Sequence, residues 1–88
     1  MPDQPHAAIA RRLRRAHGHL ESIIEMIEQG RPCAQIAQQL QAVEGAIDNA
    51  KKALIHDHIS HSLEGTLKAS GAKGQAALKE FRQIAKYL

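Results

Sequence analysis

The sequence is poor in cysteine and in aromatic residues: its 88 residues include one cysteine, one tyrosine, one phenylalanine and no tryptophan. A single cysteine excludes a disulfide bond within the chain. The residues left to form a core are mainly Leu, Ile, Val and Ala. Because straight-chain and small side chains lose little conformational entropy in a helix, the composition favours an all-α protein.

Long apolar runs are also missing. No segment is long enough to span a membrane, and the N-terminal stretch MPDQPHAAIARRLRRA lacks the apolar core of a secretion signal. We therefore expect a cytosolic protein. Residues 1–88 are at most one small domain, and a core of that size is only marginally stabilising by itself, so we also expect oligomerisation.

Basic residues are unevenly distributed along the chain. The formal net charge is only +3 with neutral histidines, yet four arginines lie close together near the N-terminus. Such clustering predicts a polyanionic partner, and an ordinary solvated helix face is the alternative interpretation. The four clustered residues are Arg11, Arg12, Arg14 and Arg15.

Apolar residues recur in alternating steps of four and three along two segments, a heptad-like pattern that packs against a partner helix. The first predicted helix covers about residues 7–28, and the second runs from about residue 32 to 63 or beyond. A shorter third helix, marked by Leu78, Phe81, Ile84 and Leu88, follows the break ASGAKG. The seam residues are Ile9, Leu13, Ala16, Leu20, Ile23 and Ile27 in the first helix and Ile36, Leu40, Val43, Ile47, Ala50 and Leu54 in the second.

Three residues of types that are unfavourable inside helices interrupt this pattern. Gly30 suits the left-handed position that ends a helix, and Pro32 suits the first turn of the next helix, so the two predict a tight αα-hairpin. Gly18 interrupts the first seam. We expect a close helix contact at Gly18, and a tolerated surface glycine is the alternative.

Potential metal ligands lie at both ends of the second predicted helix. Cys33 lies on the seam in the N-terminal turn, where the helix dipole and free N–H groups favour the thiolate. His58 and His61 lie near the other end and can approach the same interface. Thiolate and imidazole together suit Cu(I), Zn(II), Ni(II) or Co(II). The alternatives are a small buried cysteine and partly exposed polar histidines.

Distance decides how these ligands meet. In a continuous helix the 25 positions between Cys33 and His58 correspond to about 37 Å, so one chain cannot bring the two together. Two antiparallel copies of the helix can, because a two-fold axis near Gly45 and Ala46 sets Cys33 of one subunit beside His58 of the other. The sequence therefore predicts an isologous dimer with two identical inter-subunit sites.

Two segments resemble a known family, the copper-sensing, nickel/cobalt-sensing and formaldehyde-sensing transcriptional repressors (CsoR/RcnR/FrmR). The stretch RLRRAHGHLESIIEMIEQGRPC resembles the segment that leads to the family's sensor cysteine, and AQQLQAVEGAIDNAKKALIHDHISH resembles the segment that ends at its sensor histidine. The spacing from Cys33 to His58 agrees with the family. The resemblance covers nearly the whole chain.

The resemblance implies a three-helix protomer, an antiparallel four-helix-bundle dimer and a dimer-of-dimers homotetramer that represses its operator when it is ligand-free. Contact with double-stranded operator DNA in such proteins is attributed to basic residues of the first two helices. These map onto Arg12, Arg14 and Arg15, with Lys51 and Lys52 as further candidates. Phosphate contacts of this kind would make DNA binding strongly salt-dependent.

The sequence departs from the copper sensors of the family at one ligand position. Those proteins have a second cysteine four residues after the sensor histidine, where this chain has Ser62, a poor ligand. His61 or His6 could supply a third donor instead. A set of one cysteine and two histidines is closer to what nickel, cobalt or zinc accepts.

A second inducer fits the same region. Formaldehyde-sensing members of the family use an N-terminal proline amine and the sensor cysteine, which the aldehyde joins through a methylene bridge. Removal of Met1 would give Pro2 a free secondary amine, which is partly uncharged at neutral pH, and Cys33 would supply the thiolate.

Two further function classes can be compared with a repressor. A metal-binding helical bundle without a DNA role would use the same ligands, with the arginine cluster serving only solubility. An enzyme is not expected, because the single cysteine has no recognisable orienting partner and the pattern predicts no pocket-forming sheet or loop system.

Overall fold

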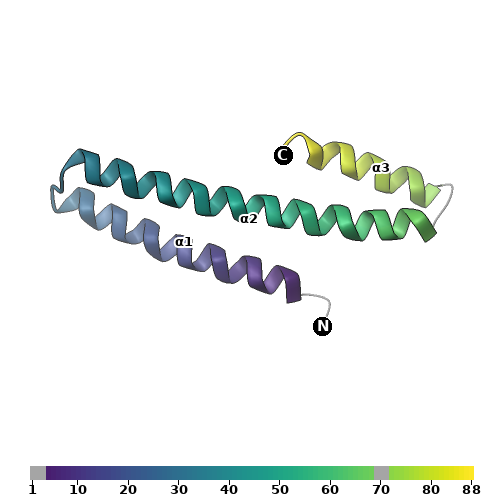
Figure 1. Cartoon of the computed structure of the whole chain (residues 1–88), viewed down its shortest axis with the longest axis horizontal. Coiled ribbons are helices and arrows are strands. Elements are labelled where there is room, and N and C mark those ends of the chain that lie inside the picture. Colours follow the sequence, from purple (N-terminus) through teal and green to yellow (C-terminus); the bar gives the residue numbers. More distant parts are fainter. Residues whose placement is uncertain (1–3, 69–71) are drawn as a thin grey trace. The chain divides into compact units, whose positions relative to one another are not determined.

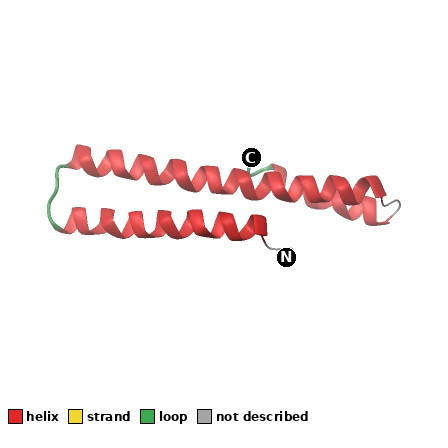
Figure 2. Ribbon diagram, turned by 60° about the horizontal axis from the view of Figure 1, so that its bottom comes forward, coloured by secondary structure: helices red, strands yellow, loops and turns green. Residues whose placement is uncertain are grey.

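The computed structural model describes residues 4–68 and 72–88 and contains three helices over those residues. They are α1 (Gln4–Glu28), α2 (Cys33–Lys68) and α3 (Ala72–Ala85) (Figure 1). No strand occurs in the described part of the chain (Figure 2). The predicted all-α class and three-helix protomer are therefore confirmed. None of the helices among these residues is long and apolar enough to cross a membrane.

The turn between α1 and α2 forms as the glycine and proline predicted. Gly30 has a φ of 72°, a left-handed conformation that costs an L side chain energy and glycine almost none. The Gly30 amide donates to the carbonyl of Ile27, and the Arg31 amide donates to that of Met26, at 3.1 and 3.0 Å. This is the Schellman pattern, which satisfies the last carbonyl groups of a helix. α2 begins one residue after Pro32.

The chain divides into two compact units, residues 1–51 and 52–88. In the first unit, α1 and the first part of α2 run antiparallel and side by side (Figures 1 and 2). The core of this hairpin uses every second member of each predicted seam, at intervals of seven residues. The buried residues are Ile9, Ala16 and Ile23 on α1 and Val43 and Ala50 on α2.

Of the remaining members of the two predicted seams, Ile36 is half-buried and the others are exposed in the single chain. Ile47 is 45% exposed and Ile27 is 56% exposed, although large aliphatic side chains gain most of their stabilisation from burial. We call five of these residues of the first unit the apolar face: Leu13, Leu20 and Ile27 of α1 and Leu40 and Ile47 of α2. The predicted seams are therefore wider than one hairpin can cover.

The expected close contact at Gly18 is wrong for the single chain. Gly18 is exposed, and a Cβ atom added to it would meet no heavy atom within 4 Å. The alternative interpretation of a surface glycine describes it better. Gly45 is equally open, with nothing within 4 Å of its position.

The second unit packs the remainder of α2 against α3. Ile55 is buried and Ile84 is half-buried, whereas Leu78 and Phe81 remain 52% and 38% exposed. α3 begins at Ala72, earlier than the apolar residues indicate, and Leu88 lies beyond its end.

Candidate functional site

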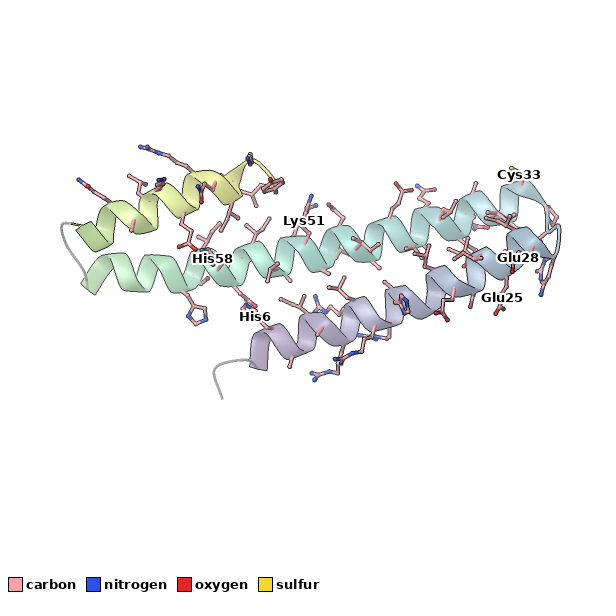
Figure 3. All side chains as sticks on the ribbon, turned by 180° about the vertical axis from the view of Figure 1, so that it is seen from behind. His6, Glu25, Glu28, Cys33, Lys51 and His58 are labelled. Atoms are coloured by element: carbon pink, nitrogen blue, oxygen red, sulfur yellow. The ribbon has the colours of Figure 1, made fainter. Side chains whose placement is uncertain are left out.

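Cys33 is the first residue of α2 and is exposed. The carbonyl of the preceding Pro32 accepts amide hydrogens from Gln35 and Ile36 at 3.0 and 3.2 Å, so the helix starts firmly at this point. Figure 3 shows Cys33 beside the interhelical turn, with its sulfur directed away from α1. The interpretation of Cys33 as a small buried hydrophobe is therefore wrong for the single chain, and its thiol is accessible to a partner.

His58 lies in the second unit and faces α3 (Figure 3). Its Nε2 atom is fully buried and lacks a hydrogen-bond partner of good geometry, but Oε1 of Glu80 lies 3.5 Å away. That distance is longer than an ordinary hydrogen bond. Histidines that bind metals commonly direct their other ring nitrogen to a carboxylate. With Nε2 facing Glu80, Nδ1 is the nitrogen that His58 can offer to an ion.

The other predicted ligands do not join these two residues within one chain. His6 on the first turns of α1 and His61 on α2 are both exposed. Pro2 lies outside the described residues. Among the side chains that the structure describes, no three His, Cys, Asp or Glu residues come close enough together to hold a metal ion. The predicted ligand set stays a prediction.

A basic groove lies between α1 and α2 in the first unit. Its volume is about 660 Å³. Two guanidinium groups and an imidazole line it on the α1 side, and an amide and a methyl group line it on the α2 side. We call this the basic groove; its residues are Arg12, Arg15, Ala16, His19, Ala46 and Asn49.

His19 holds one wall of the basic groove against the other helix. Its Nε2 lies 2.6 Å from Oε1 of Gln39, a half-buried contact between residues 20 positions apart. An amide oxygen only accepts hydrogen bonds, so His19 Nε2 carries the hydrogen. This polar contact links α1 to α2 beside the buried seam.

The remaining predicted DNA-binding residues lie outside the basic groove. Arg11, Arg14 and Lys52 are exposed. Lys51 pairs with Asp48 at 3.3 Å and lines a different hollow on α2, together with Glu44 and other residues. The predicted basic set is therefore spread over more than one face of the helices.

The apolar face and the basic groove lie on opposite sides of the seam. An α-helix turns by about 100° per residue. On α1, Leu13 is rotated to one side of the buried residue Ala16, and Arg15 is rotated to the other. On α2, Ile47 and Asn49 are rotated to opposite sides of Val43. Because the two helices are antiparallel, residues rotated in the same sense on α1 and α2 face the same side of the hairpin. Leu13 and Ile47 therefore lie on one side, and Arg15 and Asn49 lie on the other.

Cys33 continues the apolar face along α2. It precedes Leu40 by seven residues, the same interval that separates Leu40 from Ile47 and Ile47 from Leu54. One more interval along the same helix reaches His61, and His58 lies one turn before it. Cys33 and His61 therefore share a stripe with exposed apolar side chains, whereas His58 lies one turn before its end and faces α3.

Sequence reasoning missed three residues that the structure brings into these sites. Glu80 approaches His58 from another helix, and nothing in the sequence pairs the two. Asn49 lines the basic groove but carries no charge that would attract attention. Gln39 bonds to His19, and its place in the sequence directly before the seam residue Leu40 was the available signal.

Comparison with known proteins identifies the family. The family model described as metal-sensitive transcriptional repressor matches residues 5–87. The copper-sensing transcriptional repressor CsoR of Mycobacterium ulcerans (strain Agy99) is 31% identical over 87 residues, which are 99% of this chain and 72% of that protein. CsoR of Bacillus subtilis (strain 168) is 32% identical over 78 residues, or 89% of this chain and 75% of that one.

A solved structure agrees with these relatives. The nickel-responsive transcriptional regulator InrS superposes with a TM-score of 0.81 at 26% identity, covering 93% of this chain and 91% of that one. The predicted family is therefore confirmed, and its members are repressors rather than enzymes. The chain thus belongs to the metal-sensitive transcriptional repressor family and is a metal-sensing transcriptional repressor.

Proposed function

We propose that two copies of the chain pair through their apolar faces with the α2 helices antiparallel, and that a transition metal ion held between the copies releases operator DNA. The observation that carries this proposal is the stripe on α2. It starts at Cys33, continues through exposed Leu40, Ile47 and Leu54, and ends at His61. An exposed apolar stripe with a ligand at each end is what a shared, symmetric site requires.

The spacing of the stripe supports an antiparallel arrangement. Leu40 and Leu54 lie at equal distances on either side of Ile47, so a two-fold axis at Ile47 pairs Leu40 with Leu54 of the partner and Cys33 with His61. An axis near Gly45 and Ala46 pairs Cys33 with His58 instead. The two registers differ by about one helical turn, and both bring the thiol to the same pair of histidines.

The donor chemistry fits a transition metal. Cys33 and His58 are a thiol and an imidazole, which suit Cu(I), Ni(II), Co(II) and Zn(II). His61 and His6 are the candidates for a further ligand. Glu80 would hold the ring of His58 in position and leave Nδ1 for the ion. Relatives that sense copper and a structural neighbour that responds to nickel support this class of inducer.

The DNA partner follows from the repressor family and from the arginine cluster. The double-stranded operator would contact Arg12 and Arg15 in the basic groove, with Arg11, Arg14, Lys51 and Lys52 as outer contacts. Joining Cys33 to the partner's histidines would alter how the two hairpins sit together and so misalign the basic residues with the DNA phosphates. We also propose a cytoplasmic homotetramer built from two such dimers.

Fluorescence anisotropy of a duplex from upstream of the gene tests the proposal. For the wild-type protein, one of Cu(I), Ni(II), Co(II) or Zn(II) should weaken DNA binding by roughly 5- to 150-fold, the usual range of allosteric coupling. Cys33→Ala should bind the duplex and ignore the ion. His56→Ala is the matched control, because His56 is an exposed neighbour of His58 that lies off the stripe, and it should keep the response.

Two results would contradict the proposal. One is release of DNA from the Cys33→Ala protein by the same ion. The other is release of the wild-type protein by formaldehyde with no effect of any of the four ions, which would favour a site at Pro2 and Cys33.

A further inference from the structure

We propose that Glu44 and Lys51 set the orientation and register of the two copies, through symmetric ion pairs between Glu44 of each copy and Lys51 of the other. This inference rests on the proposed dimer and deepens it, because it names the charged residues that select one way of pairing the apolar faces. It places Lys51 in the dimer interface instead of among the outer DNA contacts.

Glu44 and Lys51 border the apolar face on α2. Glu44 lies four residues after Leu40, and Lys51 lies four residues after Ile47, so each follows a residue of the apolar face by about one helical turn. Both are exposed. Figure 3 shows the Lys51 side chain on the side of α2 that points away from α1. Positions that flank an apolar seam in this way are where paired helices carry the charges that decide partner choice and orientation.

A hollow beside the apolar face leaves room for side chains of a second copy. Glu44, Ile47 and Lys51 all line this hollow, and its volume is about 920 Å³. Ala37 and Gly45 line it as well, and a Cβ atom added to Gly45 would meet no heavy atom within 4 Å. The hollow is therefore continuous with the apolar face and open to the approach of another helix.

The two charged groups differ in their partners within one chain. Lys51 Nζ lies 3.3 Å from Oδ1 of Asp48, which precedes it by about one turn of the same helix. An ammonium group has three hydrogen-bond donors, so Lys51 can keep this contact and bind a second carboxylate. Glu44 has no ion-pair partner among the described residues. A second copy would supply that partner, and Asp48 would hold Lys51 in position for it.

The charge pattern favours an antiparallel pair of helices over a parallel one. The midpoint between Glu44 and Lys51 lies directly next to Ile47 in the sequence, where the stripe on α2 has its own centre. Around a two-fold axis at Ile47, each carboxylate comes beside the ammonium group of the other copy. A parallel pair in register would instead place Glu44 beside Glu44 and Lys51 beside Lys51, and like charges at an interface oppose association.

The same pattern distinguishes the two registers of the antiparallel pair. With the axis at Ile47, Glu44 and Lys51 of the partner are offset by one position, about 1.5 Å along the helix. With the other axis, which lies about one and a half residues earlier, the offset is four positions, about 6 Å. The ion pairs therefore favour the axis at Ile47 and, with it, the pairing of Cys33 with His61 of the partner.

Charge reversal tests the ion pairs, with dimer dissociation measured by analytical ultracentrifugation over a concentration series. Glu44→Lys and Lys51→Glu should each weaken the dimer at least roughly tenfold at low salt, because two attractions become two repulsions. High salt should reduce both effects. Both positions are exposed, so both variants should fold. Glu25→Lys is the matched control: Glu25 is exposed on α1, half a turn around the helix from the buried Ala16, and its reversal should leave the dimer unchanged.

Mixing the two weakened variants tests whether the charges act across the interface. A dimer of one Glu44→Lys chain and one Lys51→Glu chain has opposite charges in both pairs. Native mass spectrometry of an equal mixture, with tags of different mass on the two chains, should therefore show the mixed species above its random share. The double variant Glu44→Lys/Lys51→Glu restores both pairs within one kind of chain and should dimerise as tightly as the wild-type protein. Damage to the fold of either variant would not be reversed in these ways.

The outcomes separate this inference from the proposed function. If the single variants are weakened and both mixing and the double variant restore the dimer, the two residues pair across the interface. If the wild-type protein dimerises and the single variants match it, the inference is wrong but the proposed dimer stands. If the single variants are weakened and neither mixing nor the double variant restores the dimer, the two residues act within their own chain and the inference is also wrong. If the wild-type protein stays monomeric at every concentration, the proposed dimer itself is wrong.

Discussion

The two sides of the α1–α2 hairpin differ in what they leave for a partner. On one side is the apolar face, whose large aliphatic residues remain exposed. On the other is the basic groove, with its guanidinium groups, His19 and Asn49. Both sides flank the same buried seam of small and branched residues. The difference supports the proposal that one hairpin binds two partners, a second copy of the chain on one side of the buried seam and DNA on the other.

This arrangement bears on how a sensor could act at a distance. Cys33 lies on the stripe of the apolar face, while His19 joins the basic groove to α2 through Gln39. A change in how two apolar faces pair would therefore reach the basic groove through packed helices rather than through a flexible segment. The contrast between the two sides can be tested by substitutions on each side separately.

The largest effect is expected from a charged substitution on the apolar face. Ile47→Asp would put a carboxylate at the centre of the proposed dimer interface, where an unpaired charge is very costly. The protein should become monomeric or unfold, and DNA binding should be lost with the dimer. Native mass spectrometry at matched concentrations measures this. Gln38→Asp adds the same charge to an exposed position on the opposite side of α2 and should leave the dimer intact; dissociation of both variants alike would argue against an interface at Ile47.

An intermediate effect is expected at the ligand end of the stripe. Glu80→Gln removes the carboxylate that faces His58 Nε2, and the loss of such a partner typically weakens metal affinity by roughly 10- to 100-fold. Competition with a chelator of known affinity measures the change. Glu21→Gln neutralises another carboxylate that faces a histidine, His17, and should have no effect. Equal metal affinities for the Glu80→Gln and wild-type proteins would remove Glu80 from the site.

The smallest effect is expected on the basic side. Arg15→Ala should leave the dimer and the metal affinity unchanged and weaken DNA binding by about tenfold at low salt. The plot of log affinity against log salt concentration should become shallower by about 0.9, the loss of one phosphate contact. Anisotropy across a salt series measures both. An unchanged slope would mean that Arg15 contacts no phosphate, and a loss of the dimer would mean that the two sides of the hairpin are not independent.

The sequence predicted the helices and the turn because these depend on local chemistry. Heptad spacing marks the seam, and the φ of Gly30 is what a helix-ending glycine requires. What the sequence could not separate was the buried half of the seam from the exposed half. Both halves are aliphatic and alternate along the same helices, and only the observed packing assigns Val43 to the core and leaves Ile47 outside it.

The site was predictable to a smaller extent. Cys33, His58 and the arginines stand out by residue type, because few other side chains bind metals or phosphates. Glu80 and Asn49 become visible only once helices are packed, since their partners are distant in the sequence. The expected close contact at Gly18 is not found within the single chain, because the sequence shows that a glycine stands in the helix but not whether another segment approaches it.

A mixed dimer tests the central claim most directly, that each metal site is shared between two subunits. One subunit would carry Cys33→Ala and the other both His58→Ala and His61→Ala, with the two chains refolded together and the mixed species isolated by distinct tags. Each pure dimer should bind no inducer ion with high affinity, because every site lacks a ligand. The mixed dimer should regain one site, made by the intact cysteine of one chain and the intact histidines of the other. A mixed dimer that binds no ion, beside a wild-type dimer that does, would contradict the account.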